Sequence, residues 1–287
     1  MNKNISKKIS IFLSIIVVVY ISTILIKADI SKLLITIKNI PFFLIITIHV
    51  IIDAIIIPLR IYTNAEIEVK DHKSNFIENI NYYREYSKTA IMSLLPLASL
   101  SADIGRILTL KSAVFSGFSK KKKAFIIFKD KLIAFTGLLL YFSAIVVYEF
   151  SQNTLYLILV LLCIVIIRVK KTYKNTRIIK TIKPILLSIF GVILSTLIYY
   201  LLIRNSLQPG VSFFEVAYFI PLIILSSAIP INVIIGVKEI TGYLYFISLG
   251  ANLELAAAMV LVIYITDICS KLITLAFAEI LFKPYAK

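Results

Sequence analysis

The sequence predicts an all-α integral membrane protein with several membrane-spanning helices. Of its 287 residues, 60% are hydrophobic, and the mean hydropathy is +0.95. Apolar runs close to the ~20 residues that a helix needs to cross a ~30 Å hydrocarbon layer recur along the chain. A soluble domain with so many long Ile, Leu and Val runs would expose an impossibly apolar surface. We therefore expect residues 1–287 to form a single transmembrane domain.

Hydropathy along the chain predicts about seven full spans. We place them near residues 9–26, 40–59, 132–150, 154–169, 184–204, 212–229 and 254–282. The first span follows a basic N-terminus, but it is long for the apolar core of a signal peptide and lacks an obvious small-x-small cleavage site. We therefore interpret it as a retained helix.

Two further segments, 86–110 and 230–250, are apolar enough to enter a membrane but are interrupted by Pro, Gly and charged residues. The interrupting residues are Pro96, Asp103, Gly105 and Arg106 in the first segment, and Pro230, Gly236, Lys238 and Glu239 in the second. Irregular backbone at membrane depth is tolerated only where protein or a water-filled cavity covers it. We therefore expect both segments to wall a cavity, although the sequence shows no strong internal repeat.

The distribution of basic residues predicts which terminus and which connections between the spans face the cytoplasm. Residues 168–183 contain seven basic residues and no acid, whereas the turn at 151–154 is uncharged. Because excess Lys and Arg marks the cytoplasmic side, we expect a cytoplasmic N-terminus in a cell membrane, with residues 120–131 and 168–183 also inside. A full crossing by 86–110 would put Lys120–Lys123 outside. A re-entrant segment is therefore favoured over a true span that violates the charge rule.

Ionisable side chains inside the apolar runs occur in pairs at helical spacing. The pairs are Asp103 with Arg106, Asp267 with Lys271, and His49 with Asp53. An ion at the bilayer centre costs on the order of 2.5–3.5 kcal/mol, so such groups are usually paired, cavity-facing or functional. Each pair is therefore either a self-neutralising structural pair or part of a cavity. The nearby Gly105 and Pro96 favour a cavity role for the first pair.

Catalytic and metal-binding motifs are absent from the sequence. It contains no GxSxG, HExxH or P-loop pattern and no His/Cys cluster, and Cys163 and Cys269 both lie in apolar runs. The only sizeable polar connection, residues 60–85, is too short to form an enzyme domain. We expect a protein that is not an enzyme, with no catalytic residue, no metal site and no cofactor.

The net charge of +16 is carried largely by short basic connections between spans. Each Lys or Arg next to a membrane attracts anionic headgroups by about 1 kcal/mol. No recognisable nucleic-acid-binding fold accompanies these residues. We expect membrane lipids, in particular anionic ones, as partners and no nucleic acid; the alternative is that the lysines only set the topology.

Three stretches, in order, resemble the transmembrane domain of lysylphosphatidylglycerol synthases in its stand-alone, flippase-like form. They are "LLPLASLSADIGRILTL" (94–110), "FIIFKDKLIAFTGLLL" (125–140) and "IPINVIIGVKEITGYLYFISLGANLELAAAMVLVIYITDICSKL" (229–272). The residues that fall on the family's motifs are Pro96, Gly105 and Arg106 in the first stretch, Asp130 and Lys131 in the second, and Pro230, Asn232, Gly236, Lys238 and Glu239 in the third. Asn232 stands where a Ser is usual, and Lys238 replaces an Arg.

The resemblance implies a translocation domain without the aminoacyl-transfer domain of the bifunctional members. Its implied function is that of a transporter or flippase that moves a polar or anionic lipid, such as a glycan-carrier or aminoacylated lipid, between leaflets. The alternative is a non-transporting scaffold or partner of envelope lipid or glycan biosynthesis enzymes. Further partners to consider are a second copy of the chain and an envelope-biosynthesis enzyme.

The candidate cavity residues are the motif residues together with the charged pairs Asp103 with Arg106 and Asp267 with Lys271. Arg106 suits a phosphate ligand because its planar fork binds phosphate in a bidentate manner while staying charged. If both interrupted segments line one cavity, Arg106 and Glu239 should lie within about one lipid headgroup of each other.

Overall fold

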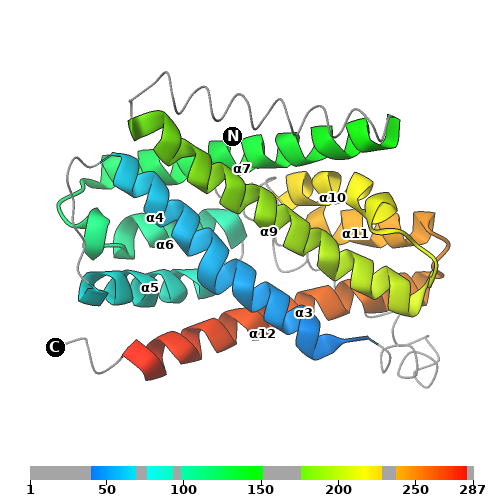
Figure 1. The fold of residues 1–287 in the computed structure, drawn as a ribbon. Helices are drawn as coiled ribbons and strands as arrows, with labels where there is room; N and C mark the ends of the chain where they lie inside the picture. Colours follow the sequence, from blue (N-terminus) through cyan, green and yellow to red (C-terminus); the bar gives the residue numbers. More distant parts are fainter. Residues whose placement is uncertain (1–39, 69–75, 93–97, 151–175, 228–236, 283–287) are drawn as a thin grey trace, which may run out of the picture.

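The computed structural model describes residues 40–68, 76–92, 98–150, 176–227 and 237–282. These residues form helices joined by turns and contain no β-strand, which confirms the all-α prediction (Figure 1). The spans predicted at 9–26 and 154–169 lie wholly outside the described residues.

Four helices in the described part of the chain are long and apolar enough to cross a membrane. They cover Phe42–Ile67, Lys120–Tyr148, Ile182–Ser206 and Leu253–Ile280. The first is a continuous run of α3 (Phe42–Ile51), a π-helical turn η1 (Ile52–Ile56) and α4 (Ile57–Ile67). The others lie within α7 (Lys120–Phe150), α9 (Thr176–Ser206) and α12 (Leu253–Phe282). Their length and composition support a membrane-embedded protein.

Helix α7 begins much earlier than the predicted span at residue 132. Its first turn carries Lys120–Lys123, and the backbone N–H of Lys122 donates to the hydroxyl of Ser119, which caps the helix. Hydropathy detects only the apolar part of such a helix, so it missed the basic first turns.

Short helices form two pairs in the sequence intervals between the long ones. The first pair is α5 (Phe76–Ile91) and α6 (Ala98–Thr109), followed by the 3₁₀ turn η3 (Ala113–Phe115). The second pair is α10 (Phe213–Ser227) and α11 (Val237–Ser248). Helix α10 starts with a capping box, in which Ser212 and Glu215 each bond the other's backbone N–H. Its 15 described residues reach about 22 Å, and because residues 228–236 lie outside the described part of the chain, the full span at 212–229 stays a prediction.

Each short pair starts and finishes at one end of the bundle. The end of α4 meets the start of α7, because Lys129 Nζ lies 2.5 Å from the Glu68 carboxylate. At the other short pair, Gln208 before α10 donates its side-chain amide to the carbonyl of Leu249 after α11, at 3.1 Å. Arg84 of α5 bonds Glu279 near the end of α12, whereas Leu249 lies just before α12 begins. The two short pairs therefore lie at opposite ends of the bundle (Figure 1).

The described helices thus form two successive sets with the same order, and the second set runs through the bundle in the opposite direction to the first. A long helix, a short pair and a long helix occur first as α3–α4, α5 with α6, and α7, and then as α9, α10 with α11, and α12. The described parts of the short helices have 16 and 12 residues in the first set and 15 and 12 in the second. The repeat is one of helix order and direction, which explains why no strong sequence repeat revealed it.

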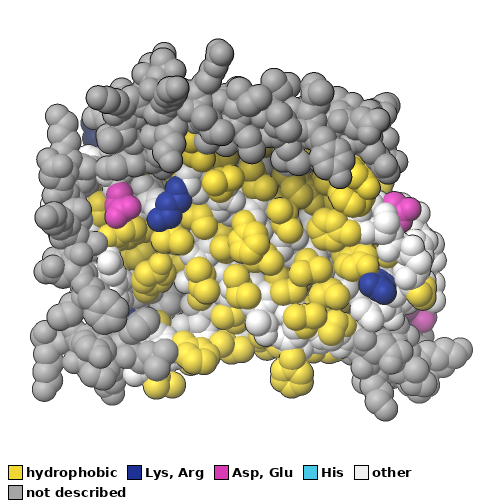
Figure 2. All heavy atoms as spheres, in the orientation of Figure 1, with side chains coloured by type: hydrophobic (Ala, Val, Ile, Leu, Met, Phe, Trp, Pro, Cys, Tyr) yellow, Lys and Arg dark blue, Asp and Glu magenta, His cyan; other side chains and the backbone are white. Residues whose placement is uncertain are grey.

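The outer surface of the helices is apolar between charged ends. Figure 2 shows one face on which hydrophobic side chains cover the centre and charged side chains lie toward the sides. On α7 the exposed apolar side chains recur at helical spacing: Phe125, Phe128, Leu132, Phe135 and Leu139. Such a stripe is what contact with lipid chains requires.

Candidate functional site

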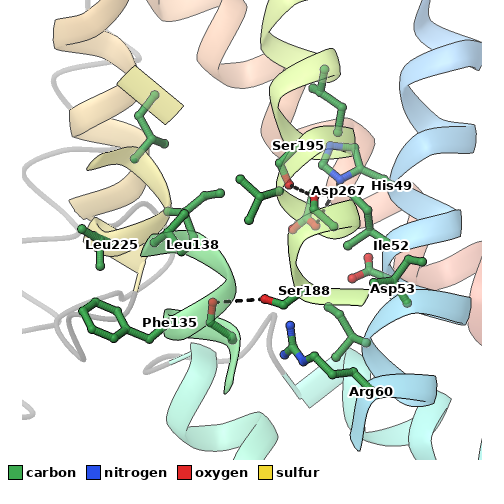
Figure 3. Close-up of a pocket in the computed structure, with 18 of the residues that line it drawn as sticks. His49, Ile52, Asp53, Arg60, Phe135, Leu138, Ser188, Ser195, Leu225 and Asp267 are labelled. Atoms are coloured by element: carbon green, nitrogen blue, oxygen red, sulfur yellow. Dashed lines mark hydrogen bonds and ion pairs between the residues drawn. The ribbon is translucent and has the colours of Figure 1, made fainter. Parts of the chain in front are cut away.

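A cavity of about 410 Å³ lies among the four long helices and α10. Its walls come from α3, η1 and α4 on one side, α9 and α12 behind, and α7 and α10 opposite (Figure 3). Most lining side chains are apolar, and a few charged ones project into the space. A largely apolar pocket with a small number of placed polar groups is the usual form of a ligand site.

The apolar rim of the cavity lies on α7 and α10. Phe135 of α7 and Leu225 of α10 both line it, and both remain exposed, by 45% and 36%. Figure 3 shows both on the opposite side of the pocket from Arg60 and His49. Because the outer face of α7 is an apolar stripe, this rim gives the cavity an apolar opening on the lipid-facing side of the bundle.

Arg60 and Lys131 supply positive charge to the cavity. Arg60 is held by Asp130 of α7 through two bonds of 2.8 Å, from Nε and Nη2 to the two carboxylate oxygens. Asn64 donates to the same carboxylate at 2.9 Å. A bidentate pair of this kind fixes the guanidinium in position. Lys131 is half-exposed, so its ammonium group is the more accessible of the two charges.

Asp103 connects Lys131 to α6. Its carboxylate bonds the ammonium of Lys131 and lies 3.0 Å from the guanidinium of Arg106. Arg106 also donates to the hydroxyl of Tyr86 at 3.2 Å and lies over its ring, 5.1 Å from the centroid. Burial raises the pKa of Tyr86 while the charge of Arg106 opposes that rise, so the hydroxyl stays protonated. The network fastens α6 to α5 and α7.

A second polar group lies deeper, where α3 and η1 meet α12. His49 Nδ1 is 3.9 Å from the carboxylate of Asp267, which also bonds Lys271 one turn further on. Ser270 donates to the carboxylate of Asp53 at 2.9 Å. His49 and Asp53 are buried, and the two acids and the histidine all line the cavity. Among the described residues, no group of three or more His, Cys, Asp and Glu side chains is arranged to hold a metal ion.

Several residues singled out in the sequence lie at or next to this cavity. Lys131 and Asp267 line it, and Asp103, Asp130 and Lys271 bond residues that line it. Pro96, Pro230, Asn232 and Gly236 lie outside the described residues, and the side chain of Lys238 does too. Gly105 packs on the side chain of Met92, which a Cβ would meet at 2.2 Å.

Arg106 and Glu239 do not line this cavity, although the sequence placed them together in one. The guanidinium of Arg106 is turned instead toward Asp103 and Tyr86, which neutralise and cover it. For Arg106, the local ion pair with Asp103, which was the alternative to a cavity role, is the arrangement seen. Glu239 acts electrostatically on Tyr199 and Tyr264, as Asp267 does, so it belongs to the surroundings of the deeper group.

Arg60 was missed as a candidate, and His49 and Asp53 were seen only as a helix pair. Arg60 follows the predicted span 40–59 directly, where a basic residue is usually taken as a topology signal. Its partner Asp130 is 70 residues away. An i,i+4 search finds only partners on the same helix.

Comparison with known proteins gives no further guide to the site, because no family model, curated protein or solved structure matches the chain. The resemblance to the transmembrane domain of lysylphosphatidylglycerol synthases stays a prediction. A functional argument therefore rests on the cavity itself.

Proposed function

We propose that this protein is a transporter of the flippase type, which moves a polar or anionic lipid between the leaflets of the cell membrane. The observation that carries the proposal is a cavity with positive charge inside and an apolar rim facing the lipid. Arg60 and Lys131 provide the charge, and Phe135 and Leu225 form the rim. A headgroup could bind inside while its acyl chains remain in the bilayer.

The energetic problem of such a transporter is the passage of a polar headgroup through hydrocarbon. Moving an isolated ion there costs several kcal/mol or more. In the cavity an anionic headgroup would meet the ammonium group of Lys131, which is half-exposed and is paired with the carboxylate of Asp103. Exchange of that partner for a phosphate oxygen would keep Lys131 paired while the lipid crosses.

The inverted order of the helices supports alternating access. Transporters built from inverted repeats often place their binding site between the two halves and expose it to each side in turn. Here the cavity is lined by α3, η1, α4 and α7 of one set and by α9, α10 and α12 of the other. In this proposal the two short pairs are re-entrant segments, and the end with Lys120–Lys123 faces the cytoplasm.

Lipid exchange in reconstituted vesicles tests the proposal. We expect the purified protein to accelerate dithionite-accessible exchange of a fluorescent phosphatidylglycerol more than that of a fluorescent phosphatidylcholine. Lys131→Gln should slow the phosphatidylglycerol exchange about fivefold, equivalent to roughly 1 kcal/mol in the barrier, because the accessible cation is lost.

Lys129→Gln is the matched control. Lys129 lies on the same helix, pairs with Glu68 and does not line the cavity, so its replacement should leave exchange within about twofold of wild type. Equal effects of the two substitutions would contradict a role for Lys131 in the cavity. Exchange no faster than in protein-free vesicles, for either probe, would overturn the transport proposal and favour the non-transporting scaffold.

A further inference from the structure

Two cations that line the cavity come from different walls, and each has a carboxylate partner. Arg60 lies on α4 and pairs with Asp130, whereas Lys131 lies on α7 and pairs with Asp103. Both cations line the same cavity. The headgroup contact proposed above involves Lys131 in particular, so the role of Arg60 in the cavity is a separate question.

The guanidinium of Arg60 has donors left for a ligand. Its two bonds to Asp130 use Nε and Nη2, which form one edge of the planar fork. Within the described part of the chain no acceptor bonds Nη1, and this nitrogen is not among the buried polar atoms that lack a partner. Figure 3 shows the guanidinium directed into the pocket. A ligand oxygen can therefore accept from Nη1 while Asp130 stays in place.

Arg60 is held in one orientation before a ligand arrives. The side chain of Asp130 is only 6% exposed, and its carboxylate accepts a third bond, from the amide of Asn64, at 2.9 Å. Asn64 is fully buried, so this support is itself fixed. A donor that is already oriented loses little conformational entropy when it binds. Arg60 is thus a preorganised contact.

Lys131 can turn to a ligand without leaving its carboxylate partner alone. Arg106 also bonds Asp103, at 3.0 Å, and the side chain of Arg106 is largely buried. If the ammonium of Lys131 moves to a ligand, Asp103 therefore keeps a cation beside it. The cavity can offer two cations at the same time, and both Asp103 and Asp130 remain paired.

The size of the cavity limits the headgroup that fits between these cations. Its volume of about 410 Å³ is near the lower end of the roughly 300–1,000 Å³ that is common for ligand pockets, and most of its walls are apolar. A phosphomonoester is small, carries close to two negative charges above neutral pH and has three terminal oxygens. Two cations can bind two of these oxygens, so the charge and the shape both match.

We propose that Arg60 is a second headgroup contact beside Lys131, and that the two together select a lipid whose headgroup ends in a phosphomonoester. One terminal oxygen accepts from Nη1 of Arg60 and another accepts from the ammonium of Lys131. The acyl chains leave the cavity past Phe135 and Leu225 at the rim. The assignment of this ligand as the transported lipid rests on the proposed function, whereas its binding does not.

Calorimetry in detergent at pH 8.5 tests the selection. The probes are a short-chain phosphatidic acid, the matching phosphatidylmethanol, whose extra methyl ester removes one charge, and inorganic phosphate. We expect the phosphatidic acid to bind about tenfold more tightly than the phosphatidylmethanol, because it uses both cations. Phosphate should bind at least tenfold more weakly than the phosphatidic acid, since it lacks acyl chains. Equal affinities for the two lipids would overturn the selection, and phosphate as tight as the phosphatidic acid would overturn a lipid ligand.

The double variant Arg60→Gln with Asp130→Asn tests the role of Arg60. It removes the cation together with its carboxylate, so no unpaired charge is left in the buried pair. It should lower the affinity for phosphatidic acid about tenfold and leave that for phosphatidylmethanol within about threefold. Arg204→Gln is the matched control, because Arg204 is exposed, bonds Tyr200 and does not line the cavity.

A second variant keeps this test decisive if the double variant does not fold. Arg60→Lys keeps a cation next to Asp130 but loses the planar fork, so the preference for phosphatidic acid should fall at least threefold. The same preference in wild type, in Arg204→Gln and in whichever Arg60 variant folds would overturn the contact with Arg60.

Lipid exchange in vesicles separates this selection from transport itself. Fluorescent phosphatidic acid should exchange faster than fluorescent phosphatidylmethanol at pH 8.5, and the Arg60 variants should reduce the difference. Exchange of both probes at equal rates would leave lipid transport standing and refute the selection. The expected binding preference without any exchange would refute lipid transport and leave the phosphomonoester site standing.

Discussion

The two short helix pairs both pack through buried aromatic side chains, but ion pairs are prominent among the described contacts of the first pair. Tyr82 of α5, for example, is fully buried and stacks on Phe115. Charged groups also hold α5 and α6. Asp103 pairs with Arg106 and Lys131, and Glu279 of α12 pairs with Arg84 and Lys88. The carboxylate of Glu85 accepts hydrogen bonds from the backbone N–H groups of Lys111 and Ser112. Apolar and aromatic packing holds α10 and α11, where Ile220 and Phe246 are fully buried. The comparison shows that directional bonds between charged groups add to aromatic packing in the first half, whereas packing predominates among the described contacts of the second.

The difference has a consequence for motion. Directional ion pairs have one good geometry, so α5 and α6 are fixed in orientation relative to α7 and α12. Packed rings, such as Phe219 and Tyr245 with centroids 4.9 Å apart, tolerate small sliding movements better than a bidentate ion pair does. We expect the α10 and α11 pair to be the one that shifts when the cavity changes its opening.

Phe246→Ala should give the largest effect and would sharpen this comparison. Phe246 is fully buried and stacks on Tyr199, with centroids 5.9 Å apart, so truncation leaves a cavity in the packed half. The expected loss is about 3–5 kcal/mol in the free energy of unfolding. Unfolding in mixed micelles should show it equally at low and high salt; a strongly salt-dependent loss would break the comparison.

Asp103→Asn should have an intermediate effect in the charged half. Lys131 and Arg106 both lose their carboxylate partner, and Arg106 is left largely buried. We expect a loss of about 2 kcal/mol. The double variant Asp103→Asn with Arg106→Gln should recover part of it, as measured in the same micelle unfolding, because the buried unpaired charge is then gone. No recovery would mean that Arg106 is satisfied by Tyr86 alone.

Glu279→Gln should have the smallest effect. Its partners Arg84 and Lys88 are more accessible to solvent than Arg106, and such pairs are screened by salt. We expect a small shift of the unfolding midpoint at low salt that disappears in about 1 M salt. Glu254→Gln, in the first turn of the same helix, serves as a control at the other end of α12. A shift that persists at high salt would show that the Glu279 contact matters more than its exposure indicates.

The sequence predicted the long helices better than their contacts. The spans placed at 40–59, 184–204 and 254–282 coincide with helices. A long apolar run marks such a helix because both its lipid-exposed face and its buried face are apolar. The same signal cannot locate a basic first turn, which is why the start of α7 at Lys120 was missed.

Partners in the site were harder to predict than its residue types. Asp267 with Lys271 and Asp103 with Arg106 are helix neighbours, so spacing identified them. The bond from Arg60 to Asp130 and the bond from Ser270 to Asp53 join distant helices, and only the packing of those helices brings them together. A charge in an apolar run therefore signals that a partner exists without naming it.

Gly137 allows α7 to approach α9 closely. A side chain at this position would meet Ser188 of α9 at 2.6 Å, so the two helices touch there almost backbone to backbone, and Ser188 donates to the carbonyl of Ala134 at 3.1 Å. The contact lies about 26 Å along α7 from Lys120 and about 20 Å from Phe150. A tilt of α7 about this contact would move one end of the helix away from α9 and the other end closer to it, so an opening at one side of the bundle would be accompanied by closure at the other.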